Sequence, residues 1–156
     1  MMLKIGDKAP EFSLLNQDNI KVSLSSFFGK WLVLYFYPKD NTPGCSIEGI
    51  EFTGLIKEFS AMNSVVVGVS ADSVKSHCNF IEKKNLGIML LSDESKEMIK
   101  SYGVYGEKKF MGKTYMGINR TTFLVDSGGK IVFVWKNVKA KAHAAAVLEK
   151  VKELVL

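Results

Sequence analysis

Residues 31–45 read WLVLYFYPKDNTPGC and contain a strand, a turn and the start of a helix. The run from Trp31 to Tyr37 is continuously apolar and rich in β-prone residues, which is typical of a central strand that is covered on both faces. Pro38 ends this strand because proline cannot continue a ladder of backbone hydrogen bonds. The segment Asn41-Thr42-Pro43-Gly44 predicts a turn that opens a helix.

The rest of the chain predicts an alternation of strands and helices around this segment. Apolar residues recur at three- and four-residue steps from Ile47 to Phe59, which indicates a helix. The other expected elements, in chain order, are a hairpin over 12–24, a strand over 64–70, a helix over 73–84, a strand over 87–91, a helix over 95–102, a long loop over 103–119, two strands over 120–126 and 130–135, and a helix over 141–156. This order fits an α/β protein with a thioredoxin-like fold, in which helices flank a central mixed β-sheet and a β-hairpin precedes it.

Composition indicates one globular domain over residues 1–156. The chain is 47% apolar and 24% charged, which is ordinary for a folded domain of this length. The longest apolar run, 31–37, is too short to cross a membrane, and the first residues lack the apolar core of a secretory signal. We therefore expect a cytoplasmic protein. The net charge of +5 is spread in ones and twos, which predicts neither nucleic acid nor a membrane as a partner.

The two cysteines are the strongest indication of chemistry. Cys45 and Cys78 are too few for a disulfide framework, and their spacing fits no zinc site. Cys45 is expected in the first turn of a helix with Thr42 as its N-cap, where free backbone N–H groups and the helix dipole favour a thiolate. Arg120, the only arginine of the chain, is the candidate cation for that thiolate. Taken singly, these features are more typical of a packed cysteine, an ordinary cap and a surface arginine.

Their combination resembles the active-site signature of the peroxiredoxins, in which proline, threonine and cysteine are spaced as Pro38, Thr42 and Cys45 are here. The surrounding sequence is similar to the bacterioferritin comigratory protein, or Q-type, branch of that family. The similar segments are Tyr35 to Cys45, Gly68 to Ser73, Leu91 to Asp93, Tyr102 to Val104 and Gly117 to Asp126. The resemblance covers the chain from about Gly6 to the end of the last helix.

The resemblance implies a thiol-dependent peroxidase that reduces hydrogen peroxide and organic hydroperoxides. Cys45 would attack the peroxide as a thiolate and become a sulfenic acid, with Thr42 placed against the sulfur and the peroxide. Arg120 would stabilise the thiolate and the leaving oxygen, and Pro38 would shield the pocket. Glu48 matches an acidic position of the family, although a carboxylate in the first turns of a helix is equally ordinary. Thioredoxin or another small thiol donor would supply electrons, no cofactor or metal is needed, and relatives suggest a monomer.

The sequence differs from the Q-type pattern at the position where many members carry a second, resolving cysteine. Ile50 occupies the position five residues after Cys45, so the commonest internal disulfide of the branch is excluded. Cys78 lies on the helix where other members place this residue, one turn before the aligned position at Ile81. Either Cys78 resolves the sulfenic acid after local unwinding, or an external thiol reduces Cys45 directly.

The histidines and an aromatic and methionine cluster carry weaker signals, and one other function fits the sequence. His77 and His143 are expected to be solvent-exposed or without a role, and a metal pair of His77 with Cys78 is disfavoured because adjacent helix residues point apart. Phe110, Met111, Tyr115 and Met116 are expected to pack as a loop over the sheet. The alternative function is a redox sensor or holdase-like protein of the thioredoxin fold, in which Cys45 signals by oxidation without turnover.

Overall fold

A computed structural model describes residues 3–155 of the chain. Its main sheet has seven strands in the order β2-β1-β5-β4-β3-β8-β9. These strands are β1 (Ser13–Asn16), β2 (Lys21–Ser23), β3 (Trp31–Phe36), β4 (Ser64–Ser70), β5 (Met89–Ser92), β8 (Thr121–Val125) and β9 (Ile131–Trp135). The fold expected from the sequence is confirmed: the sheet is mixed and begins with an antiparallel hairpin of β1 and β2.

Strand β3 is central because its apolar side chains are covered on both faces. It pairs in parallel with β4 and antiparallel with β8. Side chains along a strand alternate between the two faces of the sheet. Leu34 and Phe36 therefore join one apolar cluster, whereas Tyr35 and Tyr37 join the other, which also contains Cys45.

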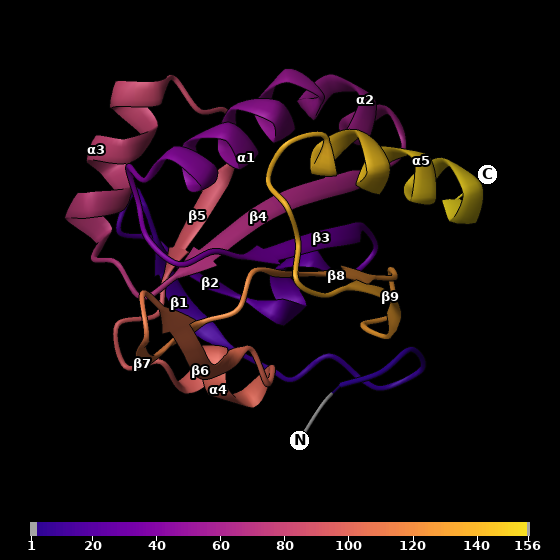
Figure 1. Ribbon diagram of the computed structural model, residues 1–156. Helices are drawn as coiled ribbons and strands as arrows, with labels where there is room; N and C mark the ends of the chain where they lie inside the picture. The colour runs from indigo at the N-terminus through magenta and orange to yellow at the C-terminus, as the bar shows by residue number, and fades with distance from the viewer. Residues whose placement is uncertain (1–2, 156) are drawn as a thin grey trace.

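Helices cover both faces of the sheet (Figure 1). The helical elements are η1 (Leu24–Phe27), α1 (Pro43–Gly54), α2 (Ile56–Ala61), α3 (Val74–Lys84), α4 (Glu97–Ser101) and α5 (His143–Val155). Helices α1, α2, α3 and α5 lie over one face, whereas α4 lies on the other side of the sheet (Figure 1). The last helix was expected to extend to Leu156, which lies outside the described residues.

Two expectations about the elements are wrong. The predicted single helix up to Phe59 is two helices, because α1 ends at Gly54 and Leu55 leaves helical geometry before α2. Glycine is a poor helix former, which favours an end at this point. The predicted loop over 103–119 is instead a second, two-stranded sheet of β6 (Tyr105–Phe110) and β7 (Lys113–Ile118).

The β6–β7 hairpin escaped prediction because most of its side chains are exposed on both faces. The regular apolar-polar alternation of a half-buried strand is therefore missing. Its turn is built by Met111 and Gly112, both with positive φ. The apolar side chains that were expected to pack over the sheet are exposed, namely Phe110, Met111, Tyr115 and Met116.

Among residues 3–155, none of the helices has the length and apolar character that a membrane-spanning segment needs.

Candidate active site

Cys45 lies in the first turn of α1, as the sequence predicts, and only 1% of its surface is exposed. Thr42 is the N-cap and Pro43 the first helical residue. Asn41 supports the sharp entry into the helix because it adopts a left-handed conformation, with φ of 61°, that asparagine tolerates well. The thiol is thus held where free backbone N–H groups and the positive end of the helix dipole meet.

Arg120, immediately before β8, brings its guanidinium to this thiol. Its Nη2 donates a hydrogen bond to Sγ of Cys45 over 3.3 Å. Nη1 donates to Oε1 of Glu48 over 2.6 Å. A fork of donors with fixed geometry therefore holds both groups at once, and the pairing of Arg120 with Cys45 that the sequence suggested is present.

Gly44 makes the approach of the guanidinium possible. A Cβ atom at this position would stand 3.1 Å from Nη2 of Arg120, which is tighter than ordinary van der Waals contact. From the sequence, Gly44 is expected only as part of a turn. The glycine directly before the cysteine was the available signal for a close approach by another group.

Glu48 is fully buried one turn beyond Cys45. Burial raises its pKa to about 7, although the charge and hydrogen bond of Arg120 act in the opposite direction. Oε2 of Glu48 is buried and has no hydrogen-bond partner among the described residues. The site therefore contains one polar atom whose bonding capacity is not used.

Further charges face the same guanidinium. Burial alone would lower the pKa of Arg120, but Cys45 and Glu48 raise it above its ordinary value. Lys108 of the β6–β7 hairpin lies close enough that burial and the charge of Arg120 lower the pKa of Lys108, while Cys45 opposes the shift. The ammonium of Lys108 donates to the Ile118 carbonyl over 2.9 Å. Sequence reasoning missed Lys108 because the hairpin that carries it was expected to be a loop.

Thr42 and Pro38 border the turn that carries Cys45, and both are half-buried. The Thr42 side chain makes no capping hydrogen bond to the helix. Its hydroxyl instead donates to the Lys39 carbonyl over 2.8 Å, which leaves the oxygen lone pairs available as acceptors.

Cys78 stands apart from this cluster. It is an exposed free thiol on α3, whereas Cys45 is a buried free thiol on α1. The structure therefore does not bring the two cysteines together as a bonded pair.

The expectation that His77 is exposed to solvent is wrong, and His143, for which no role was expected, is also buried. His77, next to Cys78, is fully buried, because it shares a helix face with Phe80 three residues later. His143 is 6% exposed and its Nε2 lies 2.8 Å from Oγ1 of Thr122. Burial and the nearby charge of Arg120 lower the pKa of His143 to about 4.

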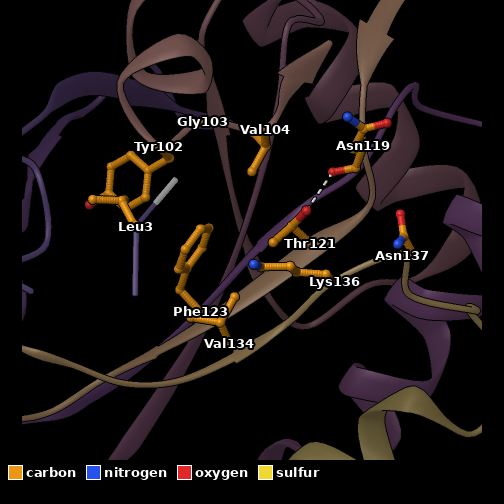
Figure 2. A pocket seen from close by; sticks show the side chains of 10 residues that line it. All are labelled: Leu3, Tyr102, Gly103, Val104, Asn119, Thr121, Phe123, Val134, Lys136 and Asn137. Carbon is orange, nitrogen blue, oxygen red and sulfur yellow. Dashed lines mark hydrogen bonds between the residues drawn. The ribbon is translucent and has the colours of Figure 1, made fainter. Parts of the chain in front are cut away.

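A cavity of about 180 Å³ lies on the other face of the sheet from Cys45. Its apolar wall is formed by Tyr102, Val104 and Phe123 (Figure 2). Polar groups are added by Asn119 and Thr121. Side chains on β8 alternate in direction, so Thr121 and Phe123 point away from the face that holds Cys45. This cavity is separate from the site at Cys45.

Comparison with known proteins places this arrangement in a family. The model of the AhpC/TSA family matches residues 5–134. A putative peroxiredoxin Bcp of Helicobacter pylori is 46% identical over 147 residues, which cover 94% of this chain and 97% of the relative. A structure of the bacterioferritin comigratory protein of Xanthomonas campestris, described in connection with alkyl peroxide reduction activity, matches with a TM-score of 0.88. It is 40% identical, covering 93% of this chain and 92% of that one.

A cysteine variant of the peroxiredoxin Q of Xylella fastidiosa has a TM-score of 0.93 and 41% identity, with 98% of both chains covered. Both the sequence and the fold therefore agree with known members over nearly the whole chain. The chain belongs to the AhpC/TSA family and, within it, to the peroxiredoxins of the Bcp or Q type.

Proposed function

We propose that this peroxiredoxin reduces hydrogen peroxide and organic hydroperoxides at Cys45, in the cytoplasm, with thioredoxin or a similar small thiol donor as reductant. The observation that carries the proposal is the 3.3 Å contact of the Arg120 guanidinium with Sγ of Cys45 at the start of α1. A cation and a helix N-terminus that converge on one sulfur favour its nucleophilic thiolate form. The alkyl peroxide reduction activity described for the Xanthomonas relative supports organic hydroperoxides as one substrate class.

In the first step the Cys45 thiolate attacks the terminal oxygen of the peroxide. A sulfur–oxygen bond forms, the O–O bond breaks, and the departing alkoxide takes a proton to become an alcohol or, from hydrogen peroxide, water. Arg120 would stabilise the negative charge as it moves from the sulfur to the leaving oxygen. The proton needed by the leaving group is available from the hydroperoxide itself.

Thr42 and Pro38 would orient the peroxide. Because the hydroxyl proton of Thr42 is committed to the Lys39 carbonyl, its oxygen can accept the hydroperoxide proton. Pro38 would limit the access of water to the turn. Glu48 would hold the second arm of the Arg120 fork, so that the other arm stays directed at Cys45.

Cys78 would act as the resolving residue. Its exposed thiol would attack the Cys45 sulfenic acid, form a disulfide and release water, and a dithiol reductant would then restore both thiols. This step requires the buried Cys45 to leave its pocket, since a disulfide needs Cα atoms within about 7 Å. We propose that the protein works as a monomer, with both cysteines supplied by one chain.

The test is rapid mixing of reduced protein with one equivalent of hydroperoxide, followed by mass analysis. The intact protein should form a Cys45–Cys78 disulfide, and thioredoxin should support repeated turnover. Cys45→Ser should abolish peroxide consumption, whereas the matched Cys78→Ser should still consume one equivalent and stop at the sulfenic acid. Full peroxidase activity in Cys45→Ser would refute the proposal, and unchanged turnover in Cys78→Ser would assign the second step to an external thiol.

A further inference from the structure

A second buried polar cluster lies beside the turn that carries Cys45, and the reaction just described does not use it. Asp40, Asp72 and His77 place their oxygen and ring nitrogen atoms within 4.8 Å of one another. Such a trio resembles a metal site, but protein donors already occupy it. Asp72 Oδ2 accepts from the backbone N–H of Asp40 over 2.9 Å and from the Ser70 hydroxyl over 2.6 Å.

The surroundings of the His77 ring determine where its protons are. Nε2 lies 2.9 Å from the Leu91 carbonyl oxygen, which can only accept, so Nε2 must donate. Nδ1 lies 2.8 Å from Oδ2 of Asp40. An ionised Asp40 also only accepts, and facing it both ring nitrogens would carry a proton, so that the two side chains would form an ion pair.

The Asp40 carboxylate is saturated by donors in the same way. Oδ1 accepts from the Tyr37 hydroxyl over 2.6 Å. Oδ2 accepts from the Ser76 hydroxyl over 2.7 Å in addition to the His77 ring. An ionised carboxylate has room for all of these bonds, whereas a protonated one would have to donate in place of one of them. The side chains of Asp40 and His77 are 2% and 0% exposed, so little water screens their attraction.

This ion pair joins two segments that carry cysteines. Asp40 lies between Pro38 and Thr42, in the turn that leads to Cys45. His77 belongs to α3, and its neighbour Cys78 is exposed to solvent. The pair therefore fastens the turn before Cys45 to the helix that bears Cys78.

We propose that the Asp40–His77 ion pair is a positioning device that holds Cys45 in its buried, peroxide-reactive place, and that its opening governs the access of oxidised Cys45 to Cys78. This inference rests on the proposed function, because it assumes that Cys45 is oxidised and that Cys78 resolves it. Cys45 is buried and bonded to Arg120, so the turn that carries it must detach from the rest of the protein before the sulfur atoms of Cys45 and Cys78 can meet.

The strength of the ion pair then determines which of two reactions consumes the Cys45 sulfenic acid. If the turn opens, the Cys78 thiol attacks the sulfenic sulfur, a disulfide forms and water leaves. If the turn stays closed, a second hydroperoxide oxidises the sulfenic acid to a sulfinic acid and is itself reduced to an alcohol. A tight pair favours sulfinic acid, and a loosened pair favours disulfide.

Asp40→Asn is the appropriate variant because the amide has the shape of the carboxylate but no charge. Its NH₂ group can donate to Nδ1 of a neutral His77 and to Ser76, and its oxygen can accept from Tyr37. The three contacts are kept, although the Ser76 hydroxyl now accepts where it donated before, and the ion pair is lost. Charge-assisted bonds are markedly stronger than neutral ones, so the turn should detach more readily.

Two measurements test the proposal. Nitrogen NMR of His77 should show both ring nitrogens protonated in the unaltered protein at neutral pH, and one in Asp40→Asn. Titration with hydroperoxide should show that Asp40→Asn needs about tenfold more peroxide for half-conversion to sulfinic acid, through faster disulfide formation. Ile131→Val is the control: it trims a buried residue on the other face of the sheet and should leave this ratio unchanged, whatever its effect on stability.

A singly protonated His77 ring in the unaltered protein, or an Asp40→Asn variant with the same product ratio as Ile131→Val, would overturn the proposal. A failure of the proposed function would give a different result. In that case the unaltered protein would form no Cys45 sulfenic acid, or would form one without a Cys45–Cys78 disulfide, while the NMR signature of the ion pair would still be present.

Discussion

Two polar clusters lie side by side at one end of the sheet, and they differ in how completely their hydrogen bonds are satisfied. Around Asp40 and His77 each carboxylate oxygen and each ring nitrogen has a partner. Around Cys45, Arg120 donates to the sulfur, and Oε2 of Glu48 has no partner among the described residues. A saturated network rigidifies a fold, whereas an incompletely satisfied one leaves groups available to a substrate.

Removal of one partner from the saturated cluster of Asp40 and His77 should give the largest predicted effect, a loss of stability. His77→Ala would leave the buried Asp40 carboxylate without its cation, which typically costs about 3–5 kcal/mol of stability. Urea unfolding followed by circular dichroism measures this loss. Lys152→Ala, which removes an ion pair with the exposed Glu149, is the control and should change stability by less than ~1 kcal/mol. Similar losses in the two variants would contradict the view that the buried cluster is structural.

In the cluster around Cys45, whose hydrogen bonds are incompletely satisfied, removal of a partner should lower the rate of peroxide reduction. Arg120→Met keeps most of the side-chain volume but removes every donor to Cys45 and Glu48. We expect the second-order rate constant for peroxide reduction to fall about 10²–10³-fold, the usual effect of losing a donor that stabilises developing charge. Stopped-flow kinetics of the reduced protein measures it. Arg120→Lys should recover part of the rate, since it restores the charge without the fork. A rate within twofold of the unaltered protein would mean that Arg120 does not act on the sulfur.

The two clusters also differ in what the sequence could predict. Cys45 was placed correctly because a strand, a proline and a capped helix follow one another within 15 residues and fix its position locally. Arg120 lies 75 residues from Cys45, and it was found because it is the only arginine and because the family resemblance singles it out.

No comparable sequence feature predicts the contact between Asp40 and His77. Their contact spans 37 residues and depends on how α3 packs beside the turn, which no local pattern records. A partial signal was present, because Val74, His77 and Phe80 recur at three-residue steps along one side of α3. That spacing indicates an inward-facing histidine, which contradicts the expectation of an exposed one beside Cys78. The β6–β7 hairpin, with Lys108, was missed for a related reason: its exposed faces give no apolar alternation.

Glu48 offers a pH test of the incompletely satisfied cluster. Its pKa is raised from 4.5 in the unfolded chain to about 7 in the folded protein, mainly by burial. Between these values the folded state holds the additional proton, so the contribution of Glu48 to stability is full below pH 4.5 and is lost as the pH rises through 7. The slope should approach ~1.4 kcal/mol per pH unit at most.

Glu48→Gln keeps an acceptor for Arg120 and removes this titration. Denaturant unfolding at several pH values from 4.5 to 8 should therefore show the decline in the unaltered protein and a flatter curve in the variant. Parallel curves would mean that Glu48 titrates alike in both states, and that the unpartnered Oε2 carries no proton.

The smallest predicted effect comes from the glycine that lets the guanidinium reach the thiol. Gly44→Ala would place a Cβ atom 3.1 Å from Nη2 of Arg120, so the guanidinium must move by a few tenths of an ångström. Since misplacement of a catalytic group by 1 Å costs about 10²-fold, this smaller shift should slow peroxide reduction about three- to tenfold. Gly54→Ala is the matched control, because a Cβ atom there meets nothing within 4 Å. The saturated cluster does not touch Gly44, so the His77 nitrogen signals should be unchanged in Gly44→Ala. A rate loss accompanied by altered His77 signals would show that the two clusters are coupled, and that their separation into a reactive and a structural part is wrong.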